Sequence, residues 1–237
     1  ILSGVNYVAY FYLTTRQIKE IFHVEEIRVY FGVILAASIF IAFNIRPLYP
    51  TLGECFRHAF FQVGSIITTT GYATTDFDLW PEVSKTILVL LMIIGACAGS
   101  TGGGLKISRL LILCKSIPKQ LSLVIHPREI KVIKMDGKAI EHQVMRATNV
   151  YLAIYFFIIL GSTLFVSVDN FDFTTNFTAV VSALNNIGPG LAGVGPTSNF
   201  GAFSVFSKFV LMFDMLAGRL ELYPLLILFM PSLWRRK

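Results

Sequence analysis

Long stretches without charge recur along the chain and divide it into a few apolar segments. Runs that lack Asp, Glu, Lys and Arg cover seventeen residues at 29–45, twenty at 86–105 and twenty-two at 147–168. A helix needs about 20 predominantly apolar residues to cross a bilayer. The three runs therefore predict membrane-spanning helices.

A fourth uncharged run, at 173–207, is thirty-five residues long and has a different character. Proline and repeated glycine break helices, so this run cannot form one continuous helix. We expect it to be interrupted at membrane depth. The interrupting residues are Gly188, Pro189, Gly190, Gly193, Gly195, Pro196 and Gly201.

The composition agrees with a membrane protein. Hydrophobic residues make up 54% of the chain and charged residues 14%, and the mean hydropathy is +0.67. A soluble domain of this length needs more polar surface. The fold class predicted is therefore an all-α membrane protein.

Charge is distributed unevenly between the apolar segments. Residues 106–146 hold nine Lys or Arg against three Asp or Glu, whereas 45–82 hold two against four. By the positive-inside rule, 106–146 and the C-terminus are cytoplasmic, and 45–82 and 169–207 face outside. The membrane spans on either side of the basic segment argue against a nucleic-acid site there.

The chain contains an internal repeat in its less regular parts. A shift of 117 residues superimposes five identical residues, and a shift of 123 superimposes a further set. The first set pairs Phe56 with Phe173, Phe60 with Phe177, Val63 with Val180, Ser65 with Ser182 and Gly71 with Gly188. The second pairs Ser84 with Ser207, Lys85 with Lys208, Leu88 with Leu211, Met92 with Met215 and Gly95 with Gly218.

The repeated unit predicts a helix that runs outward, a short re-entrant segment and a helix that returns. Because 52–69 and 174–186 are too short to cross and come back, we expect pore helices followed by extended chain. Non-helical backbone at that depth is tolerated where it is buried in protein or lines a water-filled cavity. The first unit is residues 28–115, with outer helix 28–46, pore helix 52–69, filter 70–73 and broken inner helix 82–115. The second unit is residues 146–237, with outer helix 146–168, pore helix 174–186, filter 187–190 and inner helix 204–234. Residues 1–27 precede the first unit, and the basic segment 116–145 lies between the two.

The two returning segments have the chemistry of an ion selectivity filter. Gly71 and Gly188 let the backbone turn successive carbonyls toward one axis, and rings of such oxygens replace the hydration shell of potassium. The alternative is that these glycines only allow close helix packing. The candidate filter residues are Thr69, Thr70, Gly71, Tyr72, Asn186, Ile187, Gly188 and Pro189, with potassium at Thr70, Gly71, Ile187 and Gly188.

At these residues the sequence resembles the Trk/Ktr/HKT superfamily of potassium transporters over essentially the whole chain. That superfamily has four repeats around one pore, so the resemblance implies that this sequence supplies the third and fourth repeats and that 1–13 end the second repeat's inner helix. The motifs are Thr-Thr-Thr-Gly-Tyr-Ala at 68–73, Gly-Ser-Thr-Gly-Gly-Gly at 99–104, His-Pro at 126–127, Asn-Asn-Ile-Gly-Pro-Gly at 185–190 and Leu-Ala-Gly-Arg-Leu-Glu at 216–221.

The resemblance also implies partners and a location. It implies a homodimer in the bacterial inner membrane, surrounded by lipid, with TrkA-like nucleotide-binding regulatory subunits docked on the cytosolic face. Residues 106–146 are the expected contact for those subunits. Potassium is the transported ion, and no organic cofactor is expected.

The glycine-rich loop at 99–104 admits three interpretations. A phosphate-binding loop needs a preceding strand and a Lys-Ser/Thr ending, which are missing here. A passive helix kink is the second, because glycine costs about 1 kcal/mol in a helix interior. The third, which the resemblance implies, is a gate below the filters, formed by Gly99, Ser100, Thr101, Gly102, Gly103 and Gly104.

Arg219 is the remaining candidate for the gate. It lies eleven residues after Lys208, which is roughly 16 Å into the membrane at about 1.5 Å per residue. An arginine there costs about 2.5–3.5 kcal/mol on insertion scales, so it should face water or a partner. The two interpretations are a charge in the pore, as in the resembling proteins, and an ion pair with Asp214, with Glu221 or with a residue of the missing half.

These features favour potassium uptake through a channel-like pore. An ordinary tetrameric potassium channel is disfavoured because Thr-Val-Gly-Tyr-Gly is absent and the two filters differ. An ion-coupled secondary carrier, driven by H⁺ or Na⁺, remains the alternative, since broken helices also build midplane sites. A membrane enzyme is disfavoured because no nucleophile–base or metal grouping lies at one depth.

Overall fold

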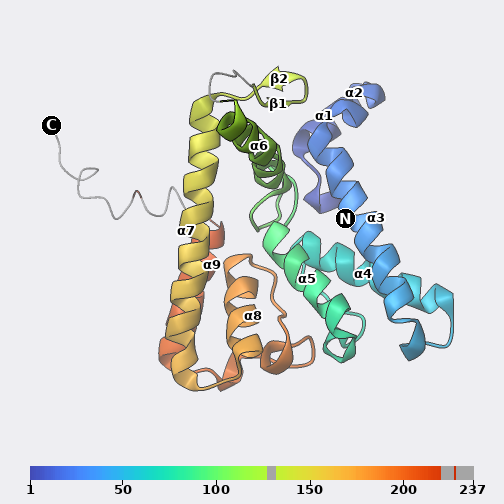
Figure 1. Ribbon diagram of the computed structural model, residues 1–237. Coiled ribbons are helices and arrows are strands. Elements are labelled where there is room, and N and C mark those ends of the chain that lie inside the picture. The colour runs from blue at the N-terminus through green and yellow to red at the C-terminus, as the bar shows by residue number, and fades with distance from the viewer. Residues whose placement is uncertain (127–131, 220–226, 228–237) are drawn as a thin grey trace.

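The computed structural model describes residues 1–126, 132–219 and 227. Figure 1 shows two long helices, α3 and α7, on opposite sides of the molecule, with shorter helices between them. The described elements are helices apart from one short hairpin. In that hairpin β1 (Lys134–Met135) pairs antiparallel with β2 (Lys138–Ala139), with Lys134 opposite Ala139.

The first repeat consists of α3 (Glu25–Asn44), α4 (Leu52–Ile67) and α5 (Glu82–Ile94). The buried residues of α3 recur every three or four positions and therefore form one face. This face packs on α4, while large apolar side chains such as Phe40 are exposed on the other side. The buried residues are Glu26, Ile27, Tyr30, Ile34, Ser38, Ile41 and Ala42.

The second repeat consists of α7 (His142–Val166), α8 (Phe173–Leu184) and α9 (Val205–Arg219). The long helix again buries a single stripe, at Thr148, Tyr151, Tyr155, Ile159, Ser162 and Val166. α3 and the stretch His142–Asp169 are both long and apolar enough to cross a membrane.

The two short helices α4 and α8 begin with side-chain caps. Thr51 accepts the N–H of Glu54, and Asp172 accepts the N–H and the hydroxyl of Thr175. These bonds favour the charged form and hold the pKa of the Asp172 carboxyl below its usual value. At 16 and 12 residues, α4 and α8 are roughly 24 Å and 18 Å long, less than a bilayer core of about 30 Å.

The core joins the two repeats. A single cluster of buried apolar residues contains Leu88 of α5, Val181 and Leu184 of α8, and Tyr155 of α7. α5 and α8 are in contact within it. The segments that follow α4 and α8 are therefore brought to the same region of the molecule.

The break in the first inner helix is longer than the glycine motif alone predicts. α5 ends at Ile94, and helix resumes with α6 (Ile107–Ile125). Gly95 follows α5 with φ 68° and ψ −160°, a conformation open to glycine that cannot continue a helix. The intramembrane loop is defined from here on as residues 95–106.

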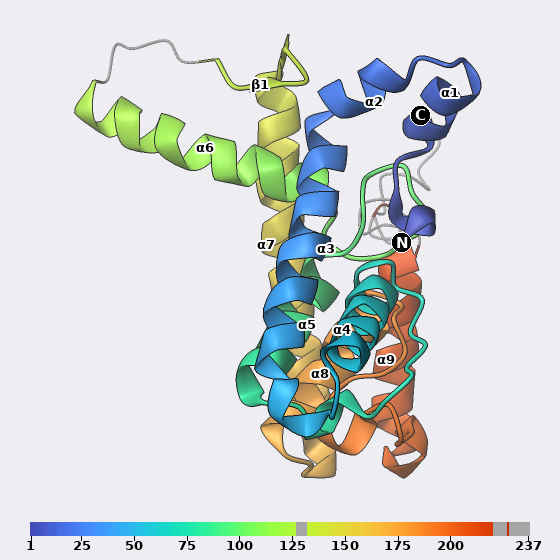
Figure 2. The same cartoon turned by 90° about the vertical axis from the view of Figure 1, so that its right-hand side faces the viewer.

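Two further boundaries differ from the expectation. α6 does not stop at residue 115 but continues through Pro118 to Ile125, and Figure 2 shows it lying across the upper part of the long helices. Residues 1–13 are not one helix, because η1 (Leu2–Gly4) is separated from α1 (Tyr7–Thr14) by a break where Asn6 caps α1.

Inner helix α9 is described to Arg219, and the rest of the predicted span to 234 lies outside the described residues, apart from Ile227.

The remaining described elements are short. α2 spans Ile18–His23 and precedes α3. Single 3-10 turns lie in the connections: η2 (Arg46–Leu48), η3 (Phe77–Leu79), η4 (Ser167–Asp169), η5 (Ala192–Val194) and η6 (Phe200–Ala202).

Candidate ion-conducting site

The two candidate filters have the same backbone. Thr69 and Asn186, which are related by the 117-residue shift, both have positive φ, at 53° and 55°. Gly71 and Gly188 are the next positive-φ residues, at 77° and 115°. Left-handed conformations at a threonine and an asparagine are uncommon. Their recurrence at equivalent positions shows that the repeat extends to the filters.

The hydrogen bonds that turn each chain away from its helix are also equivalent. The residue with positive φ donates to a carbonyl three residues back, and the next residue donates to a carbonyl five residues back, all at 2.9–3.0 Å. The pairs are Thr69 with Ile66 and Thr70 with Ser65 in the first filter, and Asn186 with Ala183 and Ile187 with Ser182 in the second.

A serine of each short helix holds its filter through the side chain. Ser65 Oγ donates to the carbonyl oxygen of Tyr72 at 2.5 Å, and Ser182 Oγ accepts the N–H of Gly188 at 3.0 Å. The sequence pairs these serines only as identical residues of the repeat. The structure gives them a reason, since a filter that leaves its helix as extended chain needs partners for its peptide groups.

The two filters lie against each other. A Cβ on Gly71 would collide with the carbonyl oxygen of Ile187. Only glycine permits this approach, and its positive φ independently favours glycine. The backbones of the two filters therefore meet without an intervening side chain.

The intramembrane loop passes next to both filters. The N–H of Gly103 donates to Thr69 Oγ1 at 3.0 Å, and a Cβ on Gly103 would collide with the carbonyl oxygen of Asn185. Tyr155 of α7 holds Asn185 from the other side, donating to its Oδ1 at 2.9 Å. The loop is thus in contact with the start of each filter.

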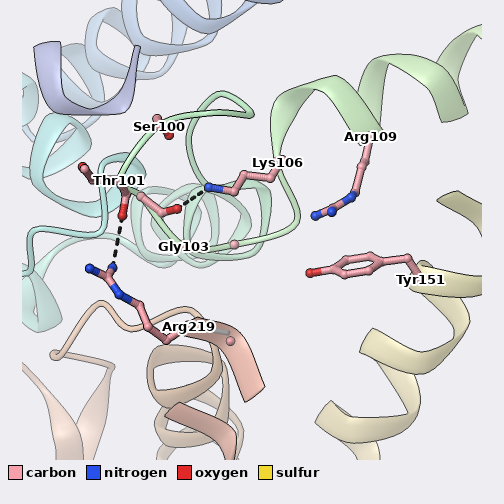
Figure 3. A pocket seen from close by; sticks show the side chains of 10 residues that line it. Ser100, Thr101, Gly103, Lys106, Arg109, Tyr151 and Arg219 are labelled. Atoms are coloured by element: carbon pink, nitrogen blue, oxygen red, sulfur yellow. Dashed lines mark hydrogen bonds between the residues drawn. The ribbon is translucent and has the colours of Figure 1, made fainter. Parts of the chain in front are cut away.

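Five residues of the glycine motif and Arg219 line one cavity of about 260 Å³ beside the loop. Arg219 donates from Nη1 to the carbonyl oxygen of Thr101 at 3.2 Å (Figure 3). Lys106 donates from Nζ to the carbonyl oxygen of Gly102, also across this cavity. Gly99 lies outside the lining, and its carbonyl accepts the N–H of Tyr7. The cavity is also lined by Arg109, which stacks on Tyr151 at 3.8 Å.

The described contacts separate Arg219 from Asp214. Asp214 is fully buried, and its Oδ1 accepts the hydroxyl of Ser162 on α7 at 2.7 Å. Arg219 instead binds the loop. Of the expected ion-pair partners in this chain, Asp214 is therefore engaged elsewhere, and Glu221 lies outside the described residues.

Comparison with known proteins places this arrangement in a family. The model of the TrkH family, described as cation transport protein, matches residues 46–236. The chain belongs to the TrkH family. The prediction of an all-α membrane protein of this superfamily is thereby confirmed.

Individual TrkH-family proteins match almost the whole chain. The Trk system potassium uptake proteins TrkH of Salmonella typhimurium and of Escherichia coli K12 are each 34% identical over 99% of this chain and 49% of their own length. The crystal structure of the potassium transporter TrkH from Vibrio parahaemolyticus superimposes with a TM-score of 0.87 at 32% identity. It is covered over 51% of its length, and 99% of this chain is matched. The chain thus spans about half the length of the TrkH proteins it matches.

The close approach at Gly103 gives a stability prediction. Gly103→Ala should lower the melting temperature, because the new Cβ must push the loop away from the carbonyl of Asn185. Gly161→Ala on α7 is the matched control, since nothing lies within 4 Å of its Cβ position. There alanine should stabilise by up to about 1 kcal/mol. Thermal unfolding of the two detergent-purified variants makes the comparison, and equal melting temperatures would contradict the packing described.

Proposed function

We propose that this chain forms half of a channel-like pore for potassium uptake. The observation that carries the proposal is the pair of backbone-equivalent filters, placed at the ends of two short helices and in contact through Gly71 and Ile187. The names of the relatives, as Trk system potassium uptake proteins, support the same ion.

The filters supply oxygen ligands without relying on side-chain charge. Backbone carbonyls near Thr70, Gly71, Ile187 and Gly188 replace the hydration shell of potassium, the transported ion. α4 and α8 both end at the filters, and the C-terminal end of a helix carries about half a negative charge. Two such ends favour a cation between them.

The intramembrane loop and Arg219 act as the gate. The loop contacts both filters through Gly103, and Arg219 is bonded to the same loop at Thr101. A guanidinium fixed beside the loop repels cations that approach it closely, since like charges a few ångströms apart repel each other. Because Arg219 is hydrogen-bonded to the loop, a displacement of the loop also displaces or releases the guanidinium. One movement would thus clear both the loop and the charge from the ion path.

The surroundings follow from this function. The filters face outward in the bacterial inner membrane, and 106–146 and the C-terminus lie in the cytoplasm. Two further repeats complete the ring around the pore, and the protein works as a homodimer. TrkA-like nucleotide-binding subunits dock on the basic cytoplasmic face.

A coupled carrier is the second candidate, and one observation favours it. Asp214 is a buried carboxyl in a membrane helix, and its Oδ2 has no hydrogen-bond partner within the part of the chain that the structure describes. Such groups mark proton relays in transporters. Discrete single-channel potassium currents from the full-length protein in planar bilayers would establish the channel, whereas uptake that requires an H⁺ or Na⁺ gradient and gives no unitary currents would establish the carrier.

Selectivity should depend on the filter glycines. Gly188→Ser should weaken discrimination of potassium over sodium, because its φ of 115° is strained for serine while the space around its Cβ is open. Gly71→Ser should have the same effect and also destabilise the fold by collision with Ile187. The measurement is the inhibition of rubidium uptake by added sodium. If sodium inhibits uptake through folded Gly188→Ser no more than through the wild type, this segment is not part of the filter.

Arg219 should limit the flux. Arg219→Ala removes a repulsive charge together with the bond to Thr101, so potassium uptake per folded protein should rise while the melting temperature changes little. Arg219→Lys keeps the charge and should stay near wild-type flux. If the guanidinium were instead half of a buried ion pair, truncation would cost about 3–5 kcal/mol. A large loss of stability in the alanine variant without a gain in uptake would refute the pore-facing role.

A further inference from the structure

The second residue of α3, Glu26, is buried although it is an acid in a largely apolar helix. It is 2% exposed. Buried carboxyls are costly unless hydrogen bonds or opposite charges compensate for the lost water. The partners of Glu26 therefore indicate what the residue is for.

Two backbone N–H groups, one inside the intramembrane loop and one just after it, donate to one carboxyl oxygen of Glu26. Ala98 donates to Oε1 at 2.6 Å, and Ser108 donates to the same oxygen at 3.1 Å. Asn6 donates to Oε2 at 3.4 Å. Ala98 is the fourth residue of the loop, and Ser108 lies just beyond the loop in the first turn of α6. A single side chain thus joins the first part of the loop to the helix that follows it.

The position at the start of α6 suits an anion. The first N–H groups of a helix have no partner within it, and the N-terminal end carries partial positive charge. Ser108 is the second residue of α6, so Glu26 binds one of these free donors. Short bonds from N–H groups to a carboxyl are stronger than neutral ones.

The preceding acid, Glu25, makes contacts of a different kind. Its carboxyl pairs with Lys115 in the middle of α6, and its N–H donates to Asp136 in the β1–β2 hairpin at 2.7 Å. Glu25 therefore binds α6 and the hairpin, while Glu26 binds the loop. The two neighbours form a natural comparison, since they share a helix turn and a charge.

We propose that Glu26 is the positioning residue that holds the intramembrane loop against the filters. Its Oε1 holds Ala98 close to Ser108 in the first turn of α6, and the loop residues between them are thereby kept in contact with Thr69 and Asn185. The effect on ion flux rests on the proposed gate. The effect on the loop itself does not.

Cys97, the residue next to Ala98, reports on the loop directly. It is fully buried, and a maleimide added to membranes that contain the full-length protein, with its other cysteines replaced by serine, should label it slowly. Glu26→Ala removes both bonds and Glu26→Asp is too short to make both, so labelling should become at least about tenfold faster in each. Glu26→Gln keeps an acceptor oxygen at the same reach and should stay protected.

Glu25→Ala is the matched control and should leave Cys97 protected, because its lost contact is with Lys115. Unchanged labelling in folded Glu26→Ala or Glu26→Asp would overturn the proposal. So would fast labelling in Glu26→Gln, or in Glu25→Ala. If Glu26→Ala does not fold, the aspartate and glutamine variants decide by the same criteria.

Potassium uptake by the same variants separates the two proposals. Faster labelling together with raised uptake in Glu26→Ala supports both the positioning role and the gate. Faster labelling with unchanged uptake keeps Glu26 as the positioning residue and removes the loop from the gate.

Discussion

Hydrogen bonding of backbone that has left its helix is the constraint on which the rest of this structure depends. In a membrane, peptide groups without a partner cost several kcal/mol each, and lipid offers no substitute for water. Both filters meet this constraint in the same way, by donating back to the last turn of a short helix and by bonding to Ser65 or Ser182. The helices α4 and α8 therefore hold the candidate filters in place through hydrogen bonds, in addition to directing their C-terminal ends at them. This shared role explains why identical residues recur along the short helices and the segments that follow them.

The intramembrane loop satisfies the same constraint with backbone bonds near its ends and with side chains between them. The N–H groups of Leu105 and Lys106 donate to the carbonyls of Ile93 and Ile94 in α5. Between the ends, N–H groups bind Glu26 on α3 and Thr69 in the first candidate filter, and carbonyls bind Lys106 and Arg219. A segment held by a few side-chain bonds opens more readily than a helix, whose bonds form and break cooperatively. The bonding pattern is thus suited to a part that moves.

Much of this arrangement could be predicted from the sequence, because it depends on local patterns. Two of the uncharged runs predict the long helices α3 and α7, and glycine and proline predict interruptions. The prediction of a single span from the third run, 86–105, is wrong, because its helix ends at Ile94. The 117-residue shift predicts that the two filters correspond. Contacts between distant residues could not be predicted. Helix α5 ends at Ile94, before the glycine motif, where Gly95 packs against the backbone of Gly103, and α6 continues through Pro118. For Arg219 the sequence offers two carboxyl partners, whereas the described bond goes to a carbonyl of the loop. Burial of Glu26 has no signature in the sequence at all.

The contact between Gly71 and the carbonyl of Ile187 has a mechanical consequence. Two segments that touch through their main chains cannot move apart or together independently, so a displacement of one is passed to the other. The side chains beside the glycines differ, with Tyr72 in one segment and Pro189 in the other. Because proline fixes its own φ, the second segment has fewer conformations with which to absorb such a displacement.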